Sequence, residues 1–132
     1  MTVADSSLIA AFVLKEDEWR SYADHLKRAH TVDHAIKEAA NAIWKAYMRG
    51  LIEDRDVRAK FAALRELFSG NLIVYPEEQL LDTAMEIAIR HKITLYDSLY
   101  LTLAIQNRLP LATLDKQQLK VAEELKIPII SL

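Results

Sequence analysis

Short apolar runs alternate along the chain with longer stretches in which apolar residues recur at helical spacing. The short runs, which we expect to form strands, are TVA at 2–4, HTVD at 30–33, NLIVYP at 71–76, PLAT at 110–113 and IPIISL at 127–132. The longer stretches, which we expect to form helices, are 6–14, 17–29, 34–52, 54–70, 77–92, 94–108 and 116–126. The helix at 94–108 is apolar nearly all round, so it should be deeply buried.

This alternation of strands and helices predicts an α/β fold. Strands that are separated by helices pair in parallel through right-handed crossovers, and continuously apolar strands suit a sheet that is covered on both faces. We therefore expect a three-layer α/β/α arrangement around a central, mostly parallel sheet of about five short strands. The 132 residues include no linker, internal repeat or low-complexity segment, so we expect a single domain over 1–132.

The composition excludes several kinds of chemistry. The absence of cysteine rules out disulfides, thiolate zinc sites and cysteine nucleophiles. With only two glycines, the chain can form neither a P-loop nor a GxGxxG dinucleotide turn. The net charge of −2 argues against broad coating of a nucleic acid duplex, but it leaves room for a small basic rim around an acidic site. The apolar stretch near the start is a poor signal peptide and no run suits a membrane span, so we expect a cytoplasmic protein.

Four acidic residues, Asp5, Glu38, Asp97 and Asp115, lie where predicted elements begin or end. Asp5 and Asp115 follow strands, whereas Glu38 and Asp97 lie in the first turns of helices. Because open parallel sheets bind their ligands at the carboxyl ends of the strands, all four should meet at one edge. Converging carboxylates repel one another unless a cation neutralises them, and oxygen-only ligands favour Mg²⁺ or Mn²⁺. The pattern predicts a metal-dependent enzyme that acts on phosphate esters.

A purely structural explanation exists for three of these acids. Asp5 and Asp97 lie at helix starts, and Asp115 with Gln118 has the spacing of a capping box, so each can cap a helix. Capping and cation binding are compatible, because a helix N-terminus favours the carboxylate form. Glu38 has no capping role, and its structural alternative is a solvated charge. It therefore carries much of the argument for a functional site.

The acids lie within three longer segments whose combined pattern is specific, although no single motif is. TLYDSLYLTLAIQNRLPLATLDKQQLKVAEELKIPII at 94–130 has an acid at a helix start, an apolar helix, a strand ending in Thr-x-Asp, another helix and a last strand. VADSSLIAAFVL at 3–14 has an opening strand, an acid and a hydroxyl two residues on, and EAANAIWKA at 38–46 has a Glu-x-x-Asn pair. Over about its full length, the chain resembles the PIN domain family, and specifically the ribonuclease toxins of VapBC systems.

The resemblance implies a set of site residues and a cofactor. The catalytic and metal-binding acids are Asp5, Glu38, Asp97 and Asp115, and the cofactor is Mg²⁺ or Mn²⁺. Ser7 and Thr113 match hydroxyl positions that orient a carboxylate or a water bound to the metal, and Asn41 would support Glu38 from one turn away. Ser98 follows the third acid, where many members carry a small residue. Where some members have a further acid after the fourth, this chain has Gln117 and Gln118, which puts a tightly held second ion in doubt.

The expected function is hydrolysis of RNA phosphodiester bonds, as in a toxin. The resemblance implies a VapB-type antitoxin as partner and a homodimer as assembly. A groove between the helices at 17–29 and 54–70 could accept an amphipathic segment of another protein. The alternative is a module that keeps the fold but has lost activity, serves as a binding scaffold in RNA processing, and uses the acids only as caps.

Overall fold

The centre of the molecule is a parallel sheet of four short strands, described by a computed structural model that covers all 132 residues. The strands are β1 (Val3–Ala4), β2 (His30–Val32), β3 (Ile73–Tyr75) and β4 (Leu111–Ala112). Their order is β3-β2-β1-β4, and every pairing is parallel. The register places Val3 opposite His30 on one side and opposite Leu111 on the other. The sheet therefore grows outward from β1 in both directions.

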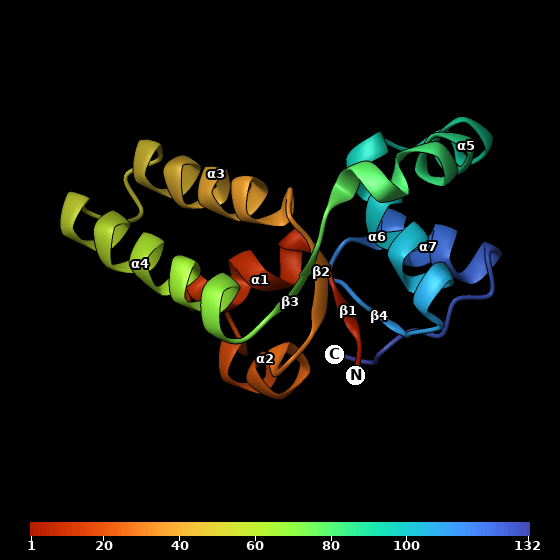
Figure 1. Ribbon diagram of the computed structural model, residues 1–132. Helices are drawn as coiled ribbons and strands as arrows, with labels where there is room; N and C mark the ends of the chain where they lie inside the picture. Colours follow the sequence, from red (N-terminus) through yellow and green to blue (C-terminus); the bar gives the residue numbers. More distant parts are fainter.

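Helices cover both faces of this sheet, as Figure 1 shows. The helices are α1 (Ser6–Val13), α2 (Trp19–Leu26), α3 (Ala35–Met48), α4 (Asp54–Gly70), α5 (Leu81–His91), α6 (Leu95–Asn107) and α7 (Lys116–Glu124), with a 3₁₀ turn, η1 (Glu77–Leu80), before α5. In Figure 1, α1 to α4 gather on one side of the strands and α5 to α7 on the other. The predicted three-layer α/β/α arrangement is confirmed.

The strand order creates a topological switch point beside β1. The chain runs from β1 outward to β2 and β3, then crosses to the opposite face and returns as β4 on the other side of β1. Loops that leave adjacent strands in opposite directions open a crevice at the carboxyl ends of those strands. In this molecule the crevice lies between the residues that follow β1 and those that follow β4.

Helix α6 is the central element of the core. Every residue from Ser98 to Ala104 is buried, which confirms the expectation drawn from its apolar pattern. It packs against β1, β2 and β4 on one side and against α5 and α7 on the other. Because the core fixes α6 from all directions, the first turn of this helix is a rigid platform at the carboxyl edge of the sheet.

The sequence pattern overestimated the number of strands. The run at 127–132 was expected to form a fifth strand, but only an isolated parallel bridge joins Ile129 to Leu111. Leu111 donates its amide to the Pro128 carbonyl at 2.8 Å, and Ile130 donates to the Leu111 carbonyl at 2.9 Å. Pro128 has no amide hydrogen, so it cannot extend the ladder toward the amino end. The pairing stops at one bridge.

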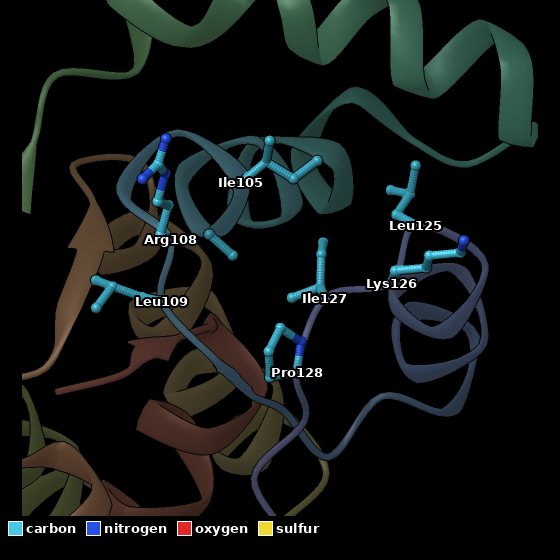
Figure 2. Close-up of a pocket in the computed structure, with 8 residues that line it drawn as sticks. Ile105, Arg108, Leu109, Leu125, Lys126, Ile127 and Pro128 are labelled. Atoms are coloured by element: carbon cyan, nitrogen blue, oxygen red, sulfur yellow. The ribbon is translucent and has the colours of Figure 1, made fainter.

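A separate apolar hollow of about 300 Å³ lies at the opposite edge of the sheet, between the ends of α6 and α7. Figure 2 shows Ile105, Ile127 and Pro128 around it, with Arg108 and Lys126 at its margin. No acidic residue lines it. No helix of the molecule has both the length and the apolar character that crossing a membrane requires.

Candidate active site

Asp5 is the most deeply placed of the predicted acids. It follows β1 directly and caps α1, accepting a hydrogen bond at 3.2 Å from the Leu8 amide. Its side chain also accepts bonds from the Ser7 hydroxyl at 2.7 Å and from the Thr113 hydroxyl at 2.5 Å. With only 1% of its surface exposed, Asp5 is held rigidly, and both predicted supporting hydroxyls contact it.

Burial raises the pKa of Asp5 to about 6, from an ordinary value of 3.8. The hydrogen bonds from Thr113, Ser7 and Leu8 oppose this rise because they stabilise the charged form, and the negative charge of Asp115 adds to it. The net upward shift means that these three donors do not fully replace the water that the carboxylate has lost. An additional positive charge at this position would be strongly favourable.

Asp97 lies in the first turn of α6, at the same edge. The Thr94 hydroxyl caps the helix and accepts a hydrogen bond from the Asp97 amide at 3.2 Å. Burial raises the pKa of Asp97, and the charges of Asp115 and Glu38 raise it further. The pKa of Asp97 therefore depends on the charges of Asp115, at the start of α7, and of Glu38, on α3. Asp97, Asp115 and Glu38 therefore lie near enough to one another for their charges to interact.

Asp115 and Gln118 form a capping arrangement that differs from a capping box. Asp115 Oδ1 accepts the Gln118 amide at 2.9 Å, as the spacing suggested. The Gln118 side chain does not return to the Asp115 amide, which donates instead to the Thr113 hydroxyl at 3.0 Å. Gln118 Nε2 reaches inward and donates to Asp5 Oδ2 at 3.1 Å and to Asp97 Oδ1 at 3.4 Å. Gln118 was not among the predicted site residues, although its place in the Asp-x-x-Gln pattern was visible.

Glu38 is held at the same edge by a partner that the sequence did not reveal. The hydroxyl of Tyr100, a buried residue of α6, donates to Glu38 Oε1 at 2.6 Å. Burial raises the pKa of this phenol, and the Glu38 carboxylate raises it further, so Tyr100 remains a proton donor. Asn41 lies one turn farther along α3, is exposed, and makes no hydrogen bond with Glu38. The structure thus brings all four acids to one edge but leaves Asn41 outside their hydrogen bonds.

An aromatic stack lies beside this acidic edge. The ring of His34, just before α3, stacks on that of Tyr96 in the first turn of α6, with centroids 4.5 Å apart and planes 8° from parallel. Glu77 approaches His34 Nδ1 at 3.7 Å, and the Glu77 amide donates to Asp33 at 3.0 Å. The stack joins the two helix starts that carry Glu38 and Asp97.

The four acids offer the kind of ligand that a hard divalent cation prefers, although they are not close enough together to form a closed ligand cage. No three or more Asp, Glu, His or Cys side chains are grouped closely enough to hold a metal ion as they stand. The four acids offer only oxygen atoms as ligands. The pKa values of Asp5 and Asp97 are raised, and the side-chain amide of Gln118 bridges these two carboxylates. Mg²⁺ and Mn²⁺ prefer such oxygen ligands and often retain several waters, so they do not require a closed cage.

The parallel sheet and the convergence of acids at its switch point define an α/β domain with an acidic edge. The chain belongs to the PIN domain family, whose model matches residues 2–124. It is 34% identical over 118 residues to Ribonuclease VapC3 from Pyrobaculum aerophilum, covering 87% of this chain and 89% of that relative. Its structure is similar to the crystal structure of PAE2754 from Pyrobaculum aerophilum, with a TM-score of 0.69, 27% identity, and coverage of 92% and 87% of the two chains. The predicted family is confirmed.

Proposed function

We propose that this protein is a metal-dependent endoribonuclease and the toxin of a VapBC-type toxin–antitoxin pair, acting in the cytoplasm. The observation that carries the proposal is the acidic edge itself. Asp5 and Asp97 have raised pKa values, and Asp115 contributes to both shifts. An arrangement that costs free energy through burial and repulsion is expected at functional sites. The similarity to Ribonuclease VapC3 supports RNA as the substrate.

The four acids have different roles in the proposed reaction. Asp5 and Asp115, at the ends of β1 and β4, would hold Mg²⁺ or Mn²⁺ together with Asp97. When bound, the ion supplies Lewis-acid stabilisation of phosphate charge and activates water. Glu38 is fixed by Tyr100 and has a free carboxylate oxygen, so it is placed to orient the attacking water. Ser7 and Thr113 keep Asp5 in one orientation while the phosphate binds.

The stack of His34 and Tyr96 supports a nucleic acid substrate. About half of the Tyr96 surface, 51%, stays exposed although its ring stacks on that of His34. Exposed aromatic faces bind unstacked bases of single-stranded RNA. Lys37 and Lys116 are exposed and lie next in sequence to Glu38 and Asp115, where each can reach a phosphate. These residues supply a small basic and aromatic margin on a chain with little net charge.

A groove in the helical layer formed by α1 to α4 suits the proposed antitoxin. It has a volume of about 400 Å³ and lies between α1, α2 and α4, with Phe12, Trp19 and Leu67 supplying apolar surface. Lys15 and Glu66 line the same groove, so an amphipathic segment of a VapB-type partner would find both apolar and charged contacts. Two of these helices, α2 and α4, are those between which the sequence suggested a groove.

A homodimer is the proposed assembly. On α5, Met85 is 47% exposed and Ile89 is 66% exposed, which leaves an apolar stripe on a surface helix. Such stripes are typical of interfaces between copies of a chain. Burial of this stripe against a second copy would remove it from water.

The scaffold alternative makes a different prediction about cations. If the acids serve only as caps, millimolar Mn²⁺ should leave the melting temperature unchanged. If they bind a cation in the folded state, Mn²⁺ should raise it by linkage. Melting the protein in EDTA and in Mn²⁺, with Asp97→Asn as the matched variant, separates the two functions. A rise for the wild type that is lost in the variant supports the enzyme.

The substrate is tested by incubating total RNA with the purified protein and Mg²⁺, and by mapping the new 5′ ends. The proposal predicts discrete cleavage positions in single-stranded regions, absent when EDTA replaces Mg²⁺. Intact RNA under both conditions, from protein that melts cooperatively, would contradict it.

A further inference from the structure

The carboxamide of Gln118 occupies an unusual position for a neutral side chain. Gln118 is in the first turn of α7, only 2% of its surface is exposed, and its Nε2 lies between two carboxylates. The nitrogen is 3.1 Å from Asp5 Oδ2 and 3.4 Å from Asp97 Oδ1. Both amide hydrogens are therefore directed at the acidic edge, where they supply partial positive charge to two acids that repel each other.

The oxygen of the same carboxamide has no partner. Gln118 Oε1 is buried and accepts no hydrogen bond. A primary amide has two donors and one acceptor oxygen, so this side chain uses all its donor capacity and none of its acceptor capacity. A buried oxygen without a partner is costly, and such groups are rare in folded proteins. The orientation of Gln118 is thus set by the two carboxylates and leaves the oxygen unsatisfied.

Rotation of the amide by half a turn exchanges its oxygen and nitrogen without changing its shape. In that orientation Oε1 would lie beside Asp5 Oδ2 and Asp97 Oδ1. Three oxygens at these separations repel one another in the cation-free protein, which explains why Nε2 faces the acids. A divalent cation reverses the preference, since it attracts the amide oxygen and repels the amide hydrogens.

We propose that Gln118 is a member of the cation site: its Nε2 bridges Asp5 and Asp97 in the cation-free protein, and its Oε1 turns toward the cation when one binds. The inference rests on the proposed metal dependence, which it extends to a residue outside the four acids. An amide oxygen would add a ligand to acids that do not by themselves form a ready group of three. The neighbouring Gln117 is exposed and has no such role.

Two substitutions at this position separate the functions of the amide. Gln118→Leu keeps much of the volume but removes both the donors and the oxygen. Gln118→Glu keeps an oxygen and removes the donors. Gln117→Leu is the matched control, because it makes the same change one residue away on the exposed surface. All variants are first melted in EDTA to establish that they fold.

The experiment is calorimetric titration of each folded variant with MnCl₂ in the absence of RNA. The proposal predicts that Gln118→Leu binds Mn²⁺ about tenfold more weakly than the wild type, or worse. Gln118→Glu should bind at least as tightly as the wild type, and Gln117→Leu should match it. If Gln118→Leu does not fold, the comparison of Gln118→Glu with the wild type shows whether an oxygen at position 118 favours Mn²⁺ binding.

Contrary outcomes are distinguishable. Equal or tighter binding by Gln118→Leu would show that the amide only separates the acids, and it would overturn this inference while leaving the metal-dependent function intact. Weaker binding by Gln118→Glu would overturn it too, because an oxygen at this position would then be unfavourable to the cation. Absence of Mn²⁺ binding to the wild type would overturn both the inference and the proposed metal dependence.

Discussion

Asp5 combines two properties that usually conflict. It is buried almost completely, yet it is surrounded by donors that stabilise its charge, from Ser7, Leu8, Thr113 and Gln118. Burial has the larger effect, so the pKa of Asp5 rises to about 6. The folded protein therefore holds a proton on Asp5 more tightly than the unfolded chain does, which links the stability of the cation-free protein to pH.

The raised pKa of Asp5 predicts that the cation-free protein loses stability as pH rises. Because the folded pKa lies above the ordinary value of 3.8, the stabilising contribution is fully present below about pH 3.8 and is lost as pH rises through about 6. At about 1.4 kcal/mol per pKa unit, the loss is on the order of 3 kcal/mol. Asp5→Asn has no titrating group at this position and should not show this loss.

The measurement is urea unfolding of the wild type and Asp5→Asn in EDTA, from pH 4 to pH 8. The unfolding free energy of the wild type should fall relative to that of the variant as pH rises through about 6. If the two free energies change in parallel across this range, burial of Asp5 does not raise its pKa.

The sequence predicted some contacts between site residues and missed others. Asp5, Ser7 and Thr113 were expected to lie together, and their hydrogen bonds join them. The place of Asp5 at the end of a strand was readable from local pattern, whereas the supporting roles of Ser7 and Thr113 came from the resemblance to the PIN domain family. The partnership of Glu38 with Tyr100 was not, because it spans 62 positions and depends on how α3 and α6 face each other. Long-range side-chain geometry of this kind leaves no periodic signal.

Helix α6 illustrates how one element positions a functional residue. Its N-terminus is capped by Thr94, whose hydroxyl accepts the Asp97 amide at 3.2 Å. A side-chain hydrogen bond from Thr94 also opposes the rise in the pKa of Asp97. The cap therefore fixes both the helix start and the placement of Asp97.

Removal of this cap gives a prediction at the element scale. Thr94→Ala should lower the free energy of unfolding by about 1 kcal/mol, the usual cost of losing an N-cap hydroxyl. Thr94→Ser retains the hydroxyl and should recover most of that loss. Urea unfolding in EDTA measures both values. Equal destabilisation by Ala and Ser would show that the methyl group of Thr94, and not its hydroxyl, holds the helix start.

The elements themselves followed the hydrophobic pattern closely, with one informative failure. The continuously apolar α6 was recognisable because a helix without a polar face must be buried. The terminal run at 127–132 had strand composition, yet it forms only a bridge from Ile129 to Leu111. Composition reports the tendency of a segment to be extended, whereas ladder length depends on the hydrogen-bonding partners on the neighbouring strand.

At the scale of the whole molecule, two apolar surfaces outside the acidic edge are the proposed contacts with other chains. One is the groove between α1, α2 and α4, and the other is the α5 stripe of Met85 and Ile89. They lie on opposite helical layers of the sheet (Figure 1). A dimer formed through α5 would therefore leave the groove available to another protein.

The dimer proposal predicts a solution mass of twice 15.1 kDa by size-exclusion chromatography with light scattering. Ile89→Glu places a charge in the middle of the stripe and should shift the protein to the monomer mass. Ile105→Glu introduces the same charge on α6, beside the apolar hollow of Figure 2, and should leave the dimer intact. A monomeric wild type at micromolar concentration would contradict a dimer.

The central claim is that the acids at the switch point cleave RNA with the help of a divalent cation. The most direct measurement is the cleavage rate of a defined single-stranded RNA by the wild type and by Asp97→Asn, in Mg²⁺ and in EDTA. The account predicts cleavage by the wild type in Mg²⁺ alone, and a loss of roughly 100-fold or more in the variant, with cooperative melting retained. Equal rates for the two proteins, or undiminished cleavage in EDTA, would contradict it.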